Sequence, residues 1–77
     1  MAVTLRRGDS GNLVRLLQAT LNRDYPLYSR LVVDGDFGPA TEAVVMEFQR
    51  RAGLAIDEPG VAGPETLKRL GLNFRSN

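Results

Sequence analysis

The chain has 77 residues, of which 43% are apolar and 25% charged, and its formal net charge is +1 at pH 7. This length allows a single small domain, residues 1–77, because typical domains contain roughly 100–150 residues. The composition is too apolar for a disordered chain. The weak net charge does not favour a nucleic-acid-binding surface, so we expect a folded domain that does not bind nucleic acid.

Histidine and cysteine are both absent from the sequence. Without them the chain has no disulfide, no cysteine or histidine zinc site, no serine–histidine pair and no thiolate nucleophile. A glycan hydrolase needs two carboxylates across a sugar cleft, and a small helical domain offers little volume for such a cleft. We therefore predict no catalytic activity, no metal and no cofactor.

The amino terminus carries no recognisable targeting segment. Residues 1–8 lack the apolar run of roughly 7–15 residues that follows the positive charge of a signal peptide. No apolar stretch approaches the roughly 20 residues needed to span a bilayer. We expect no membrane partner, and the sequence leaves the compartment open.

Three Gly-x-x-Gly segments divide the chain into repeated units of a loop and a helix. These segments are Gly8–Gly11, Gly35–Gly38 and Gly60–Gly63. Each is followed by apolar residues at helical spacing. The second and third patterns end with cations followed by Gly53 and Gly71, and the first ends at Arg23 shortly before Pro26. These signals and the spacing predict helices at about 11–23, 39–52 and 64–70.

The first predicted helix carries apolar residues at intervals of three and four. They are Leu13, Val14, Leu16, Leu17 and Leu21. This pattern is typical of an amphipathic helix with one face in a core. Asp9 or Ser10 can cap its start, since either side chain can accept a backbone N–H of the first turn.

A long connection, Asp24–Gly35, follows the first helix. Its apolar Leu31–Val33 stretch is too short to build a sheet, so we predict a loop with at most isolated bridges. Tyr25, Tyr28 and Arg30 are candidate ligand residues here, because tyrosine and arginine offer flat surface with a polar group. One tyrosine ring could instead cover the helical core.

The Asp-Gly-Asp-Phe-Gly segment before the second helix contains most of the other candidates. The carboxylates of Asp34 and Asp36 can accept hydrogen bonds from sugar hydroxyls or peptide N–H groups, and Phe37 could stack on a ligand. Gly38 and Thr41 complete this group. A structural interpretation is also open: Asp34 could accept N–H groups of its loop, Phe37 could anchor it in the core, and Thr41 could tie the turn.

Gln18 and Gln49 occupy matching places in the first and second helices, each after an apolar residue. A buried glutamine has to satisfy about four hydrogen bonds. We therefore predict that each glutamine ties a loop backbone to its helix. The second and third helices also share a Gly-Pro start, which suits the first helical position.

Taken together, these motifs and their spacing resemble the type-one family of peptidoglycan-binding domains. The matching segments include Leu5–Gly11, Leu17-Gln18, Val33–Gly38, Phe48-Gln49 and Gly63–Thr66. The resemblance runs from about Leu5 to Leu72 and implies a small all-α bundle of three helices. One departure lies in Asp57–Gly60, which is two residues longer than the Asp-Gly pair usual at that place.

The resemblance implies non-catalytic binding of bacterial cell-wall peptidoglycan, through its glycan strand or its stem peptide. Such a monomeric module would bring an attached or associated cell-wall hydrolase, phage lysin or virion component to the wall. The alternative is a protein-interaction or assembly adaptor with the same fold. We expect one shallow groove formed by the second loop, the start of the second helix and the Tyr25–Arg30 loop.

Overall fold

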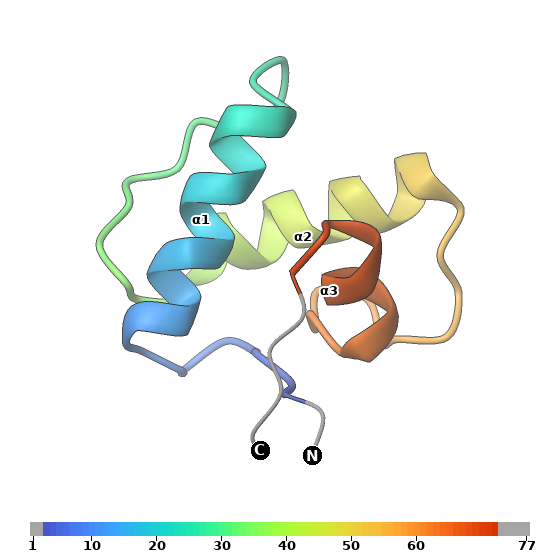
Figure 1. The fold of residues 1–77 in the computed structure, drawn as a ribbon, viewed down its shortest axis with the longest axis horizontal. Helices are drawn as coiled ribbons and strands as arrows, with labels where there is room; N and C mark the ends of the chain where they lie inside the picture. The colour runs from blue at the N-terminus through green and yellow to red at the C-terminus, as the bar shows by residue number, and fades with distance from the viewer. Residues whose placement is uncertain (1–2, 73–77) are drawn as a thin grey trace.

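The computed structural model describes residues 3–72, which form three α-helices (Figure 1). α1 spans Asn12–Asp24, α2 spans Pro39–Ala52 and α3 spans Pro64–Arg69. Across these described residues there is no strand, and the extended pairing consists of two isolated antiparallel bridges, Leu5 with Ala62 and Ser10 with Asp36. The all-α class predicted from the sequence is confirmed.

The start of α1 differs from the prediction. Its N-cap is Gly11, at a φ of 120° that glycine adopts readily, and no side chain caps the helix. The Asp9 carboxylate instead accepts the backbone N–H of Arg6 at 3.0 Å within its own turn. The prediction that Asp9 or Ser10 caps α1 was therefore wrong, and the helix begins at Asn12.

α2 and α3 begin as the Gly-Pro pairs predict, each with an extended glycine at the N-cap and proline at the first helical position. α2 ends at Gly53, whose φ of 71° is left-handed. None of the helices within residues 3–72 combines the length and the apolar character that crossing a membrane requires.

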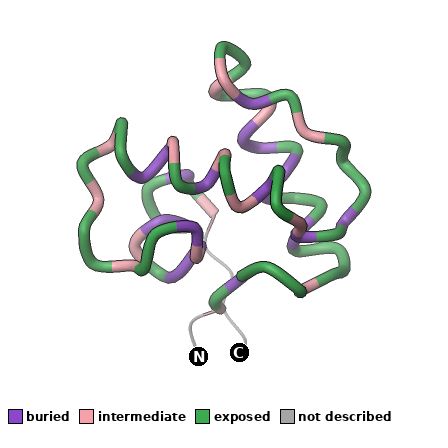
Figure 2. The backbone as a smooth tube through the Cα atoms, turned by 180° about the vertical axis from the view of Figure 1, so that it is seen from behind, coloured by how far each residue is buried: buried purple, intermediate pink, exposed green. Residues whose placement is uncertain are grey.

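The helices enclose one apolar core. Its buried residues are Leu5, Val14, Leu17, Leu21, Phe37, Val45, Phe48, Ala62, Leu67 and Leu70. Buried and exposed positions alternate along the helices in the backbone view of Figure 2. Leu13 and Leu16 lie at the edge of the buried stripe of α1 and are 39% and 45% exposed, so the buried face is narrower than its apolar pattern suggests.

The connection after α1 runs back along the length of that helix (Figure 1). Leu31, in the middle of this connection, is bound by the side chain of Asn22 near the end of α1. The Asn22 side chain accepts the N–H of Leu31 and donates to its carbonyl, both at 2.8 Å. The connection then meets the start of α1, where the Gly11 N–H donates to the Gly35 carbonyl at 2.9 Å. Tyr25 and Gly35 therefore lie at opposite ends of a helix of 13 residues, roughly 20 Å long.

Candidate ligand-binding site

Gln18, which is buried, organises the loop before α2. Its side-chain oxygen accepts the Gly35 N–H at 2.9 Å, and its amide nitrogen donates to the Asp36 carbonyl at 3.0 Å. The same nitrogen lies 3.2 Å from Asp34 Oδ1 and 3.1 Å from Thr41 Oγ1. The prediction that Gln18 ties a loop to its helix is confirmed.

Three of the candidate ligand residues in this loop have structural positions. Phe37 is 2% exposed and its ring belongs to the core, while Thr41 is 3% exposed with its hydroxyl facing Gln18. Gly38 is the N-cap of α2, and its N–H donates to the Asp36 carbonyl. These residues shape the loop and present little surface to a ligand.

The two carboxylates of the loop are exposed but differ in their surroundings. Asp34 Oδ1 accepts the backbone N–H of Asp36 at 2.9 Å. This bond, and after it the contact with Gln18, lowers the pKa of Asp34 from its ordinary value. The Asp36 carboxylate has no hydrogen-bond or ion-pair partner within residues 3–72, so it is the one that a ligand can reach without displacing a contact.

Gln49 makes a second set of contacts of the same kind in the loop before α3. Its oxygen accepts the Gly60 N–H at 2.9 Å, and its nitrogen donates to the Val61 carbonyl at 2.9 Å and to Thr66 Oγ1 at 3.0 Å. Gln49 is 5% exposed. The prediction for Gln49 is confirmed, and the two extra residues of the Asp57–Gly60 segment do not disturb the arrangement.

Tyr25 and Tyr28 lie at the other end of α1, over the second half of α2. Their rings stack with centroids 5.8 Å apart, and Tyr25 also packs against Phe48 at 5.0 Å. The guanidinium carbon of Arg51 lies 4.6 Å from the centre of the Tyr28 ring. Burial, with a smaller contribution from Tyr25, raises the pKa of Tyr28 from its ordinary value.

These aromatic residues border an open cleft of about 400 Å³, which we term the tyrosine cleft. It is lined by Asp24, Tyr25, Pro26, Leu27, Tyr28, Phe48, Arg51, Ala52 and Arg69. Its lining comes from the ends of all three helices and from the turn after α1. Aromatic rings and guanidinium groups on one open surface can bind a flat or anionic ligand.

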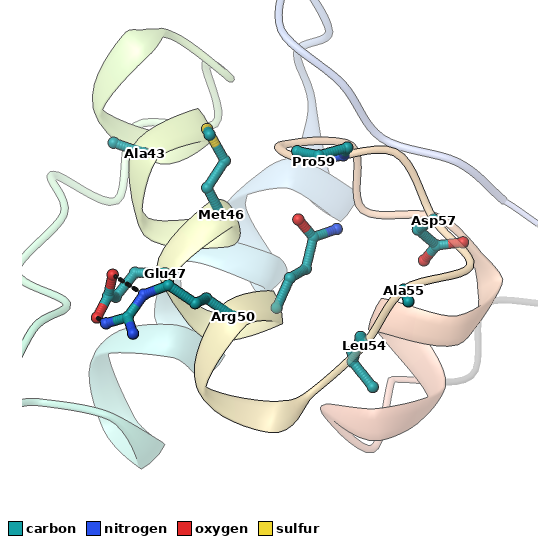
Figure 3. A pocket seen from close by; sticks show the side chains of 9 residues that line it. Ala43, Met46, Glu47, Arg50, Leu54, Ala55, Asp57 and Pro59 are labelled. Carbon is teal, nitrogen blue, oxygen red and sulfur yellow. Dashed lines mark hydrogen bonds and ion pairs between the residues drawn. The ribbon is translucent and has the colours of Figure 1, made fainter.

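A second cleft, of about 520 Å³, lies between the outer face of α2 and the connection to α3 (Figure 3). This α2 cleft is lined by Ala43, Met46, Glu47, Gln49, Arg50, Leu54, Ala55, Asp57 and Pro59. Most of the lining is apolar. The ion pair of Glu47 with Arg50 lies on the α2 side, and Asp57 lies on the connection (Figure 3).

Within residues 3–72, the sequence candidates lie in two places at opposite ends of α1 and not in one groove. Neither cleft is lined by any of residues 34–41, and the length of α1 separates that loop from Tyr25 and Tyr28. Arg30 is exposed and lines neither cleft. Sequence reasoning missed Arg51 and Arg69 as candidates. Both lie in the last turn of a helix, where the helix dipole already accounts for a cation without any role in ligand binding.

Comparison with known proteins places this three-helix module in a family. The model of the peptidoglycan binding domain family matches residues 10–70, and the chain belongs to that family. The chain is 47% identical over 68 residues to the zinc D-Ala-D-Ala carboxypeptidase of Streptomyces albus G. It is 48% identical over 60 residues to the N-acetylmuramoyl-L-alanine amidase CwlM of Mycobacterium tuberculosis.

The chain corresponds to a small part of these curated relatives. The two alignments cover 87% and 78% of this chain but 26% and 14% of the relatives. Among solved structures, the Burkholderia AP3 phage endolysin superposes with a TM-score of 0.79 and 40% identity, over 96% of this chain and 27% of the endolysin. The SleB N-terminal domain gives a TM-score of 0.78 and 35% identity, over 90% of this chain and 89% of that domain. The fold and the family predicted from the sequence are confirmed.

Proposed function

We propose that this chain is a non-catalytic module that binds peptidoglycan and thereby brings a cell-wall hydrolase or phage component to the bacterial wall. The observation that carries the proposal is the family match over residues 10–70. A carboxypeptidase, an amidase and an endolysin each contain a region similar to this chain as a minor part of their length. A small module next to a separate catalytic part is the arrangement that targeting requires.

The open shape of both clefts supports a modest affinity for the isolated module. Shallow clefts leave a ligand partly in water, and ordering a flexible wall segment opposes binding. Attachment to an enzyme or particle that binds the same wall raises the effective concentration and offsets this weakness. Of the sequence candidates, we retain Asp34, Asp36, Tyr25, Tyr28 and Arg30 as ligand contacts, since each keeps exposed surface.

An adaptor that binds a partner protein is the second candidate. Three large apolar side chains favour it: Leu27, Val32 and Ile56 are 92%, 76% and 83% exposed. Leu27 and Val32 lie on the connection between α1 and α2, and Ile56 lies on the connection between α2 and α3. A protein partner would cover at least one of them.

Sedimentation with purified sacculi tests the proposal directly. We expect the chain to appear in the pellet at low and at physiological salt, while an unrelated protein of similar size and charge stays in the supernatant. Recovery of the chain in the supernatant under both conditions contradicts wall binding. A complex with a defined partner protein, lost when Leu27 or Ile56 is changed to serine, then supports the adaptor.

A further inference from the structure

The tyrosine cleft lies where the carboxyl-terminal ends of the three helices meet. Asp24 is the last residue of α1, Ala52 of α2 and Arg69 of α3, and all three line the cleft. The last turns of these helices carry cations, namely Arg23, Arg50, Arg51, Lys68 and Arg69. Half of the ten cations of the chain are therefore concentrated in these turns.

Two of the three charged side chains that line the cleft, Asp24 and Arg51, form ion pairs within residues 3–72, and Arg69 does not. Asp24 is already engaged, since its Oδ1 accepts Arg23 Nε at 2.8 Å. Arg51 forms an ion pair with Glu47 at 2.6 Å. Arg69 makes no ion pair and no side-chain hydrogen bond with any residue of the described range 3–72. The cleft thus contains a guanidinium whose donors face no protein acceptor in that range.

Helix dipoles explain part of this charge distribution. A cation in the last turn offsets the partial negative charge of the unpaired carbonyls. This effect acts through position alone and leaves the five N–H donors of a guanidinium unused. A carboxylate can take two of those donors at once, in the planar geometry that arginine favours.

The aromatic contacts of the cleft favour an anion over a sugar ring. Tyr25 stacks on Tyr28 and packs against Phe48, and the Arg51 guanidinium lies over the Tyr28 ring. A sugar that stacked on either tyrosine would have to compete with these contacts. Stacking on Tyr28 instead restricts Arg51, so less conformational freedom is lost when its guanidinium binds a ligand.

We propose that the tyrosine cleft binds a carboxylate of the peptidoglycan stem peptide, with Arg69 as the principal contact and Arg51 as the second. This inference rests on the proposed function, because it selects the peptide part of the wall over the glycan strand. The volume of about 400 Å³ accommodates the end of a short peptide. Pro26, Leu27 and Ala52 supply apolar surface for small side chains next to the carboxylate.

Binding to intact sacculi and to glycan strands without stem peptides separates this inference from the proposed function. An amidase that cleaves the bond between muramic acid and the stem peptide removes the cross-links and releases soluble glycan strands, so these strands are attached to beads before binding is measured. We expect the chain to sediment with intact sacculi and to show little binding to beads that carry the glycan strands. Equal binding to both materials overturns the carboxylate inference and leaves wall binding intact. Binding to neither overturns both.

Two variants with a matched control test the residues. Arg69→Gln and Arg51→Gln are each expected to weaken binding to intact sacculi about ten-fold, as the loss of one charge-assisted hydrogen bond predicts. Arg6→Gln, which removes one exposed guanidinium outside both clefts, is expected to bind as the unchanged chain does. Far-UV circular dichroism checks that all three fold. Unchanged binding by a folded Arg69→Gln overturns the inference.

Nuclear magnetic resonance locates the contact. Titration with the free tetrapeptide L-Ala–γ-D-Glu–diaminopimelate–D-Ala should shift the backbone amides of Tyr28, Arg51 and Arg69. The same peptide with its carboxylates converted to amides should cause shifts at least about ten-fold smaller at equal concentration. Equal shifts from both peptides, or shifts centred on Met46 and Leu54 of the α2 cleft, overturn the inference.

Discussion

The loop before α2 and the loop before α3 are built on the same plan but use their acidic residues differently. In the first, Gln18 binds Gly35 and Thr41; in the second, Gln49 binds Gly60 and Thr66. Each glutamine accepts a glycine N–H and donates to a threonine hydroxyl at the start of the next helix. A buried glutamine, rather than a disulfide or a metal, therefore fixes each loop to its helix.

The aspartates of the two loops differ because the second loop is two residues longer. Asp34 accepts the N–H of Asp36 and stabilises its own turn. Asp57 lies farther from its glycine, and its Oδ2 accepts the backbone N–H of Thr66 at 2.7 Å in the first turn of α3. Glu65, in the first turn of α3, forms hydrogen bonds back to the loop, since its carboxylate accepts the N–H groups of Ile56 and Asp57.

The added capping suits the length of α3. This helix has six residues, and isolated helices shorter than about 12–15 residues are marginal in water. α2 has 14 residues and begins without any side-chain cap. The comparison indicates that the longer loop supplies first-turn hydrogen bonds that the shorter helix needs and that α2 does without.

Replacement of the two buried glutamines is expected to have the largest effect on the free energy of unfolding. Gln18→Leu and Gln49→Leu each leave a buried glycine N–H and loop carbonyls without partners, so we expect each to lower the free energy of unfolding by about 3 kcal/mol. Urea denaturation followed by circular dichroism measures this, with Arg6→Gln as the control. A loss below about 1 kcal/mol for either variant would show that its loop closes without the glutamine.

Substitution of the two N-cap glycines, Gly38 and Gly63, by alanine is expected to have an intermediate effect on stability that differs clearly between the two positions. A Cβ at Gly63 would lie 2.5 Å from Asp57 Oδ1, whereas a Cβ at Gly38 meets nothing within 4 Å. Both glycines have ordinary negative φ angles, −89° and −104°. We expect Gly63→Ala to cost about 2 kcal/mol and Gly38→Ala about 0.5 kcal/mol in thermal or urea unfolding.

Repeating the two glycine substitutions in a chain that also carries Asp57→Ala tests whether the Asp57 carboxylate causes the difference between Gly63→Ala and Gly38→Ala. Asp57→Ala alone should cost about 1 kcal/mol, the usual value for a lost cap. Once Asp57 is gone, Gly63→Ala should cost no more than Gly38→Ala, because the colliding carboxylate is absent. Additive losses in the double variant would show that the clash is not with Asp57.

The smallest effect concerns the pH dependence of Asp34. Its folded-state pKa lies below the ordinary value of 3.8, so its stabilising contribution is complete above that pH and disappears as the pH falls through the folded-state pKa. The difference in unfolding free energy between the unchanged chain and Asp34→Asn should therefore shrink as the pH falls below 3.8. A difference that stays constant down to pH about 2 would contradict the contacts of Asp34 with Asp36 and Gln18.

Local patterns were sufficient to predict the helices and the loop glutamines. The Gly-Pro starts and the spacing of Val14, Leu17 and Leu21 act within a few residues, so the sequence displays them directly. The width of the buried face of α1 could not be predicted in this way. Leu13 and Leu16 belong to the same apolar pattern, and only the position of α1 against the other helices leaves them partly exposed.

By itself, the sequence determined the three-helix fold, the family and the two tied loops, because periodicity, turn residues and paired glutamines are local signals. Only the tertiary structure decided which candidates reach the surface. Phe37 and Thr41 are buried because the loop folds onto α1, and the tyrosines lie far from that loop because α1 separates them. The pairing of Tyr28 with Arg51, and the presence of Arg69 in the same cleft, depend on helix ends that meet only when the chain is folded.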